Sequence, residues 1–576
     1  MPNFHYRVAI PEPTAHLLQL ELQVTDWQGG VLDWKLPVWS VGSYLVREYS
    51  KHIVAFSANC PVVKLAKNHW QLQPTSNSIV INYSVYANEL TVRTNHVDAT
   101  HAFFNSGAVF GFIEGYLAEP YRIEIVLPYP HWQIATALPP IVNTTNSFCA
   151  PNYHVLADSP FEIGLHRKYI FDVLGKTHEL VIWGEGNIQP ETTITDIRKI
   201  IETEAEFWGS LPYDRYLFIL HLSTGGYGGL EHRDCCVLLY DRWGFRGDAY
   251  LKFLNLVAHE FFHTWNVKRL RPASLFQINY EQENYTHSLW LCEGITSYYD
   301  QLLVLRAGLC DCNQYFQQIS EAITRLQTTI GRKYQSLWES SFDAWIKLYR
   351  PDSNSHNAQV SYYLKGELVA LLLDLHIRLH SANKFTLDDI MRALWQRYGI
   401  PAQPYDDMEV LALMEQITGV ELQSFWQKYL FGTAELDYEY YFQPFGLELQ
   451  AQSTRNIPYT GLQFRTQNGT LLVKSVDLHS PAQRAGIDAN DEIIALNRRK
   501  VSLESIYNRL SECAPGTTVE LTIFHQDELR HTQVELAPAQ ADRYVVQVLD
   551  KPTPEQLERL NQWLGLSTGS LSKRDS

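Results

Sequence analysis

The stretch VAHEFFHTWNVKRLRP (257–272) places two histidines four positions apart, with a glutamate directly after the first. Residues i and i+4 lie on the same face of an α-helix, so His259 and His263 would project together and could hold one metal ion. Glu260 would then lie beside the metal, where a general base can take a proton from an activated water. For this stretch alone, a core helix with two hydrogen-bonded histidines remains the alternative.

A third metal ligand is expected downstream, because a catalytic zinc takes three protein ligands and keeps one position open. SLWLCEGITSYYD (288–300) offers Glu293 after an apolar run, and a carboxylate buried there needs a cationic partner. Asp300 follows seven positions later and is a candidate to orient a ligand histidine, with a solvated helix end as the alternative. The intervening RPASLFQINYEQENY is expected to form a loop near the cleft.

Two further segments carry candidate substrate-binding groups. STGGYGGLEHRD (223–234) is rich in glycine, which lets a ligand approach the backbone closely. Glu231, after Gly228 and Gly229, suits a cationic group such as the α-amine of a peptide, and a tight turn with a surface glutamate is the alternative. SYYLKGELVALLLDL (361–375) begins a helix with two tyrosines, which are either packing residues or hydrogen-bond donors to an oxyanion.

Composition limits the class of protein. A chain of 576 residues exceeds a single core, and 45% hydrophobic residues indicate a folded protein. The formal charge of -16 argues against a nucleic-acid partner and against binding to anionic lipid. The sequence shows no signal peptide, no membrane-spanning run and no CxxC pair among its eight cysteines, so we expect a soluble cytoplasmic protein.

The pattern along the chain predicts a multidomain α+β protein. Residues 1–165 alternate with a period of two between turns, which predicts an N-terminal all-β domain, a β-sandwich. Residues 166–435 begin with strands and continue as a helical lobe. Residues 433–455 are linker-like or form a short strand, residues 456–548 are strands with one helix, and residues 549–576 are a short helix and a polar tail. Helical spacing occurs at 192–211, 249–269, 286–306, 312–331, 358–380, 386–398 and 406–428.

Together these segments resemble the gluzincin metallopeptidases, and most closely the glycyl aminopeptidase family of PDZ-containing zinc metallopeptidases, over nearly the whole chain. HEFFHTWNVKRLRP resembles the zinc helix of that family, and WLCEGITSYY resembles its third-ligand helix. YLKG resembles the catalytic tyrosine segment YEKG, which assigns that role to Tyr363 rather than Tyr362. GGLEH resembles the Gly-x-Met-Glu-Asn motif of related aminopeptidases, from which Leu230 and His232 depart. WSVGSYLVREY resembles a Trp-x-Pro-Gly-Ser-Tyr segment, with Val41 in place of proline, a change that affects a turn.

The resemblance implies a thermolysin-like peptidase domain over 166–435 with one Zn²⁺ per chain. The zinc ligands it implies are His259, His263 and Glu293. Glu260 would be the general base, Tyr363 would stabilise the oxyanion, and Glu231 would bind the free N-terminus of a peptide substrate. The implied activity is an aminopeptidase that prefers N-terminal glycine or alanine. An oligo- or endopeptidase of the same fold, and a peptide-binding PDZ scaffold with a vestigial peptidase domain, are the alternatives.

The segment from TGLQF (460–464) to ALNRRKV (495–501) resembles a PDZ domain, which implies that residues 456–548 form one. Its loop of Gly461, Leu462, Gln463 and Phe464 would present backbone N–H groups to a terminal carboxylate, so the C-terminus of a peptide is a candidate partner. Gln463 departs from the usual Gly-Leu-Gly-Phe pattern, and a packing or substrate-gating module is the alternative. The sequence leaves the oligomeric state and the physiological substrate open.

Overall fold

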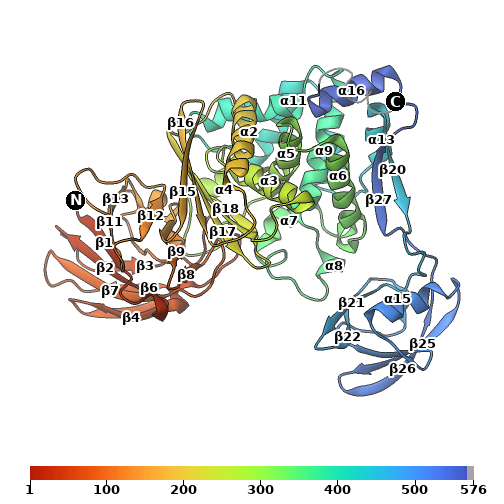
Figure 1. Cartoon of the computed structure of the whole chain (residues 1–576), viewed down its shortest axis with the longest axis horizontal. Coiled ribbons are helices and arrows are strands. Elements are labelled where there is room, and N and C mark those ends of the chain that lie inside the picture. The colour runs from red at the N-terminus through yellow and green to blue at the C-terminus, as the bar shows by residue number, and fades with distance from the viewer. Residues whose placement is uncertain (567–576) are drawn as a thin grey trace. The chain divides into compact units, whose positions relative to one another are not determined.

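The computed structural model describes residues 1–566 (Figure 1). The chain divides into two compact units. Unit 1 consists of Met1–Tyr285 and Arg392–Asp406, and unit 2 consists of Thr286–Met391 and the chain from Asp407 onward. The predicted multidomain α+β class is confirmed: a β-rich N-terminal region, a helical central region and a C-terminal region of short strands. The predicted polar tail, SLSKRDS, lies outside the described residues.

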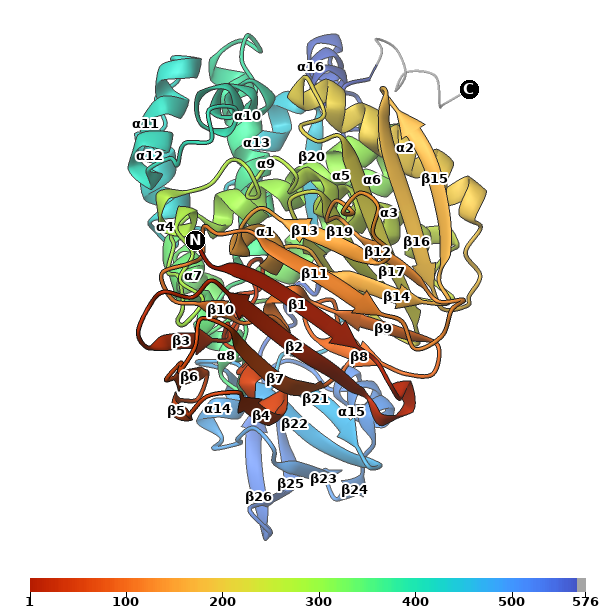
Figure 2. The same cartoon turned by 90° about the vertical axis from the view of Figure 1, so that its left-hand side faces the viewer.

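Three sheets form the N-terminal region of unit 1 (Figure 2). The first has the order β13-β11-β1-β2-β7-β4, and β2 buries every second side chain of LLQLELQVT, as its period of two predicts. Its strands are β1 (Asn3–Ala9), β2 (Leu17–Thr25), β4 (Ile53–Ala58), β7 (Ile79–Tyr86), β11 (Tyr121–Val126) and β13 (Ser147–Ala150). The second contains β3 (Leu32–Lys35), β5 (Val62–Ala66), β6 (His69–Leu72) and β10 (Phe112–Ile113). The third has the order β12 (Gln133–Thr136), β14 (Phe161–Gly164), β9 (His101–Phe104) and β8 (Asn95–Val97).

A fourth sheet in unit 1 has the order β15-β16-β17-β19-β18. β17 pairs in parallel with β16 and β19, and its almost continuous apolar run is buried, as expected for a central parallel strand. β18 lies at the edge of the sheet, antiparallel to β19. The strands are β15 (Arg167–Val173), β16 (Lys176–Trp183), β17 (Arg215–Ser223), β18 (Tyr227–Glu231) and β19 (Cys235–Asp241). Helices α2 (Pro190–Trp208) and α3 (Gly247–Phe262) follow β16 and β19 in the chain.

The segment RPASLFQINYEQENY, predicted as a loop, is tied to the N-terminal region. It contains a short helix, α4 (Ala273–Phe276), followed by Tyr280, which is buried in the core of the β-rich region. The Trp39 indole donates to the backbone oxygen of Asn279 at 2.9 Å, and Lys35 pairs with Glu281 at 3.0 Å. These contacts fasten the β-rich region to the chain that leaves α3.

Unit 2 contains a helical part and two strand-rich parts. The helical spacing predicted at 358–380 corresponds to α9, whose run LVALLLDL is buried on every side. The main helical elements are η4 (Trp290–Gly294), α5 (Ile295–Arg306), α6 (Cys312–Gln327), α9 (Tyr362–His380), α11 (Asp407–Thr418) and α16 (Pro554–Leu564). No helix within the described chain is both long and apolar enough to cross a membrane.

A two-stranded ribbon is formed by the strands that come directly before and directly after the C-terminal sheet in the sequence. β20 (Leu447–Gln452) pairs antiparallel with β27 (Arg543–Val548), so the chain that leaves for this sheet returns beside its point of departure. The Ser320 hydroxyl of α6 accepts a hydrogen bond from the N–H of Val546 at 2.9 Å, which attaches the ribbon to the helices. The sheet order is β21 (Leu462–Gln467), β22 (Thr470–Val476), β23 (Glu492–Leu496), β25 (Thr518–His525) and β26 (Glu528–Glu535), with α15 (Leu503–Ser511) as its longest helix.

Candidate metal centre

The C-terminal end of α3 carries the two histidines of the opening motif. His259 lies in the last turn, and His263 follows the helix with right-handed helical backbone angles. Their ring centroids are 4.7 Å apart and the ring planes meet at 88°. The apolar residues of α3 hold this end of the helix in the core: Leu251, Phe253, Leu254, Leu256, Val257, Ala258, Phe261 and Phe262. The local spacing therefore brings the two imidazoles together on one side of the helix.

The helix predicted over 249–269 ends at Phe262. The chain beyond it turns back toward His263 and fixes the tautomer of that residue. Its Nδ1 lies 2.9 Å from the backbone oxygen of Asn266. A carbonyl oxygen only accepts, so Nδ1 carries the proton and Nε2 keeps its lone pair for a metal. Val267 then turns the chain with φ of 98°, a conformation that β-branched residues rarely adopt.

Glu260 lies against the backbone of β18. A Cβ atom placed on Gly229 would lie 1.9 Å from Glu260 Oε1 and 2.2 Å from its Cδ, so only glycine leaves room for this carboxylate. The guanidinium of Arg93 donates to the backbone oxygen of Gly229 at 3.1 Å and holds the strand in place. Gly228 has no such restriction, because a Cβ there would meet its nearest neighbour, Arg93 Nη1, at 3.9 Å.

Unit 1 also places Glu231 close to Glu260 and His263. One ligand atom from each of Glu231, Glu260 and His263 lies within 4.8 Å of the other two. Glu231 is 3% exposed, and its Oε1 has no hydrogen-bond partner in the described part of the chain. A buried carboxylate oxygen without a partner is costly, and such groups in native proteins commonly have a functional role.

The N-terminal segment WSVGSYLVREY supplies the wall opposite Glu231, which sequence reasoning missed. Gly42 has φ of +89°, and a Cβ there would lie 2.4 Å from Glu231 Oε1. Gly42, Tyr44 and Glu231 are among the residues that line a cavity of about 20 Å³. Only the glycine in the quoted motif could have signalled this close approach, and glycine has many other uses.

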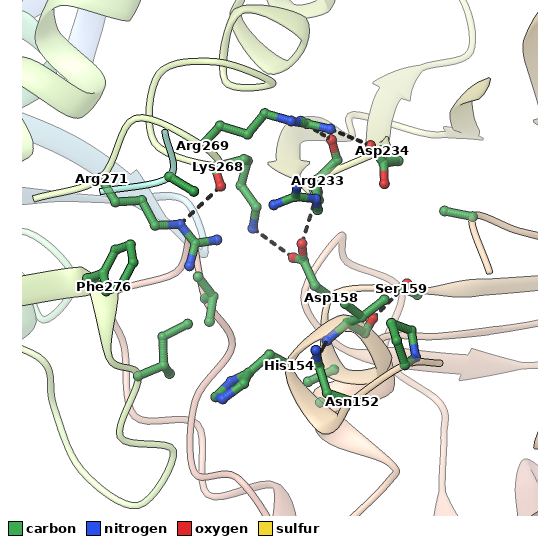
Figure 3. A pocket seen from close by; sticks show the side chains of 18 of the residues that line it. Asn152, His154, Asp158, Ser159, Arg233, Asp234, Lys268, Arg269, Arg271 and Phe276 are labelled. Carbon is green, nitrogen blue, oxygen red and sulfur yellow. Dashed lines mark hydrogen bonds and ion pairs between the residues drawn. The ribbon is translucent and has the colours of Figure 1, made fainter. Parts of the chain in front are cut away.

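Unit 1 also contains a larger cavity of about 820 Å³ (Figure 3). Its lining includes Lys268, Arg269 and Arg271, which follow the turn at Val267. Lys268 pairs with Asp158 at 2.7 Å and Arg269 with Asp234 at 2.6 Å. Burial opposes the ionisation of Asp158, but Lys268 and His232 outweigh it and hold its pKa well below the usual range. The Lys268–Asp158 pair is largely buried and joins the chain after the turn at Val267 to the β-rich region, whereas the Arg269–Asp234 pair joins it to the segment between β18 and β19.

Unit 2 positions Glu293 in the π-helical segment η4, and it is 1% exposed. π-Helical turns are rare and often occur at functional sites. A Cβ on Gly294 would lie 2.6 Å from the Cα of Gly366 in α9, so the two glycines let η4 and α9 touch backbone to backbone. Asp300 follows in α5 and is 8% exposed. Its role in orienting a ligand histidine remains a prediction.

The two tyrosines at the start of α9 differ in their surroundings. Tyr362 is fully buried, whereas Tyr363 is partly exposed, and their rings stack at 4.6 Å. The hydroxyl of Tyr363 lies 3.4 Å from that of Tyr349. Exposure favours Tyr363 as the tyrosine that meets a ligand.

The loop predicted to bind a carboxylate begins at Gly461, which has φ of +79° and packs against Ser480. Leu462, Gln463 and Phe464 continue as β21, whose outer edge pairs with no other strand in the described chain. The Gln463 side-chain amide lies 3.0 Å from His356 Nε2. A groove of about 670 Å³ runs beside α15, lined by Arg455, Ile457, Leu503, Glu504, Tyr507, Asn508 and Ser511.

Comparison with known protein families gives three matches along the chain. Residues 5–165 match the Peptidase M61 N-terminal domain, residues 252–369 match the M61 glycyl aminopeptidase, and residues 458–536 match the PDZ domain. No curated protein matches the chain.

Among solved structures, an aminopeptidase N family protein from Idiomarina loihiensis is similar at 31% identity. The match covers 97% of this chain and 100% of that one, with a TM-score of 0.92. An M1 zinc metallopeptidase from Deinococcus radiodurans is 12% identical over 76% of this chain and 95% of that one, with a TM-score of 0.47. Yeast LTA4 hydrolase in complex with bestatin is 11% identical over 77% of this chain and 70% of that one, also at 0.47.

Proposed function

Because the chain belongs to the M61 glycyl aminopeptidase family of zinc metallopeptidases, we propose that it removes single small residues from the free N-termini of peptides. The alternatives, an oligo- or endopeptidase of the same fold and a scaffold with a vestigial peptidase domain, predict different substrates or no hydrolysis.

We propose that His259, His263 and Glu293 hold one zinc ion. Two imidazoles and a carboxylate are a donor set that catalytic zinc takes, and the proton on His263 Nδ1 leaves Nε2 as the ligand atom. A zinc ion in such a site lowers the pKa of a bound water and polarises the scissile carbonyl.

The general base of the proposed reaction is Glu260, which takes a proton from the attacking water and passes it to the leaving amine. The observation that carries the aminopeptidase proposal is the carboxylate beside it. Glu231 is buried, has an oxygen without a partner in the described chain, and lies within 4.8 Å of Glu260 and His263. A substrate ammonium group would supply the missing hydrogen bonds and the opposite charge. Anchoring the amine there sets cleavage at the first peptide bond.

Tyr363 is proposed to donate a hydrogen bond to the oxyanion that forms on the scissile carbonyl. The preference for glycine and alanine is supported by the cavity beside Glu231. At about 20 Å³, it has room for about one water-sized group. A bulky first side chain would have to displace Gly42 or Tyr44.

The PDZ domain is proposed to bind the C-terminus of a peptide along the free edge of β21. The positive φ at Gly461 and the groove beside α15 support this proposal.

The test is hydrolysis of glycyl, alanyl and leucyl arylamides, with N-acetylated versions as controls. We expect the glycyl and alanyl substrates to be cleaved and the acetylated ones to resist. Glu231→Gln should lower kcat/KM for free-amine substrates by about 10- to 150-fold, since a hydrogen bond to a charged group contributes about 1.5–3 kcal/mol. Efficient cleavage of acetylated peptides would favour the endopeptidase. Absence of both zinc and hydrolysis would favour the scaffold.

A further inference from the structure

A second cluster of metal-ligating residue types in unit 1 contains none of the residues of the candidate metal centre. His101 on β9, Glu162 on β14 and His221 on β17 have side chains with no exposed surface. One ligand atom of each lies within 4.8 Å of the other two. His101 Nδ1 is 3.0 Å and His221 Nε2 is 2.8 Å from the Glu162 carboxylate. The cluster joins residues that are far apart in the sequence.

This cluster requires a cation. The Glu162 side chain is fully buried, and the ion-pair partners of its carboxylate in the described chain are all imidazoles. A fully buried carboxylate is stable only beside a positive charge. Either a proton on one of these imidazoles or a metal ion can supply that charge.

The surrounding imidazoles favour the metal ion. His166 is 4% exposed, its Nδ1 lies 3.9 Å from Glu162 Oε1, and neither ring nitrogen has a hydrogen-bond partner within residues 1–566. A protonated His101 would satisfy Glu162 and leave both nitrogens of His166 unbonded. A metal ion would bind the one ring nitrogen of a neutral His166 that has a free lone pair.

The outer contacts of His101 are also those of a metal ligand. Its Nε2 lies 2.8 Å from Nδ1 of His96, so the nitrogen that faces away from Glu162 has a partner of its own. The indole of Trp183 stacks on its ring with centroids 3.6 Å apart and planes at 6°. Ligand histidines commonly use the second ring nitrogen in this way, which fixes the tautomer and the orientation of the ring.

We propose that His101, Glu162 and His221 bind a structural zinc ion, with His166 as the fourth ligand after a rotation of its ring. Zinc bonds of 2.0–2.1 Å in a tetrahedral site place neighbouring ligand atoms about 3.4 Å apart. The separations from the Glu162 oxygens to the three histidines, 2.8, 3.0 and 3.9 Å, lie on both sides of that value. Three histidines and one carboxylate make a closed site, as structural zinc requires.

The ion would join two sheets. His101 and Glu162 belong to the third sheet of the N-terminal region, whereas His221 belongs to β17 in the centre of the fourth sheet. β17 pairs with β19, which pairs with the strand of Glu231. The proposed zinc therefore holds the β-rich region to the sheet that carries the peptidase residues.

The test uses the full-length His259→Ala variant, which removes a ligand of the proposed catalytic centre and leaves the second cluster intact. Purified chains are refolded with Zn²⁺, freed of excess metal and analysed for metal content by mass spectrometry. We expect about two zinc ions in the wild type and about one in His259→Ala. X-ray absorption at the zinc edge of His259→Ala should show nitrogen and oxygen neighbours only. Glu162→Gln should lose one ion and keep hydrolytic activity.

A His259→Ala protein that folds and contains no zinc above background would overturn the proposal. That result does not depend on whether Glu162→Gln folds. The two proposals fail separately. One ion per wild-type chain, lost in His259→Ala, would refute the second site and support the catalytic centre. A single zinc ion per chain that is kept in His259→Ala and lost in Glu162→Gln would support the second site and refute the catalytic centre.

Discussion

Replacing Gly229 by alanine should displace Glu260, because the new Cβ would lie 1.9 Å from its Oε1 and 2.5 Å from its Cγ. The carboxylate must retreat by roughly 1.5 Å to reach an ordinary van der Waals separation. The obstacle is the end of a flexible side chain, so the protein is expected to fold. A misplacement of about 1 Å at a catalytic group costs on the order of 10²-fold in rate. We therefore expect kcat to fall by about that factor while KM changes little.

Gly228→Ala is the matched control, since a Cβ at this neighbouring position meets its nearest atom at 3.9 Å. Both variants lose the same backbone freedom in the unfolded chain, so their thermal unfolding should be similar. The assay is steady-state hydrolysis of glycyl and alanyl arylamides, with circular dichroism to verify folding. If Gly229→Ala folds and keeps wild-type kcat, Glu260 does not act as the base from this position. If Gly228→Ala loses as much activity, stiffening of β18 explains both results.

Three further predictions concern the tyrosine, a buried charge pair and the metal. Tyr363→Phe should lower kcat by about 10²- to 10³-fold at unchanged KM, the cost of removing an oxyanion donor, whereas Tyr362→Phe should leave kcat within a few-fold. Asp158→Asn should destabilise the protein by about 3 kcal/mol in urea unfolding at pH 7, because it leaves Lys268 buried without its partner. The pKa of Asp158 is lower in the folded protein than in the unfolded chain, so the pair stabilises the fold fully above the ordinary aspartate pKa of about 4. The difference in unfolding free energy between wild type and Asp158→Asn should therefore shrink as the pH falls through the folded-state pKa. A difference that stays constant with pH would contradict this. Dialysis against a chelator should abolish hydrolysis and added Zn²⁺ should restore it, and full activity in metal-free protein would exclude the metallopeptidase mechanism.

Local spacing in the sequence predicted much of the fold and part of the site. The period of two in LLQLELQVT gave a strand with alternate side chains buried, and the four-residue spacing of His259 and His263 placed both rings together. Such patterns succeed because strand and helix geometry depends on neighbouring residues. The helix predicted to 269 ended at Phe262, since the hydrogen bond from His263 to Asn266 and the turn at Val267 are not visible in hydrophobic spacing. Helical spacing at 286–306 also did not predict that η4 is π-helical.

The sequence by itself determined the family, the order of the structural regions and the residue types available for chemistry. Only the tertiary structure decided which glycines are indispensable, because Gly42 meets Glu231 and Gly229 meets Glu260 across separate elements. It also brought together His101, Glu162 and His221, which no sequence spacing connects, in one buried cluster. The physical reason is how far apart in the sequence the residues that determine each feature lie. Helix and strand periodicity is fixed by local backbone geometry, whereas close approach and charge compensation depend on how distant elements pack.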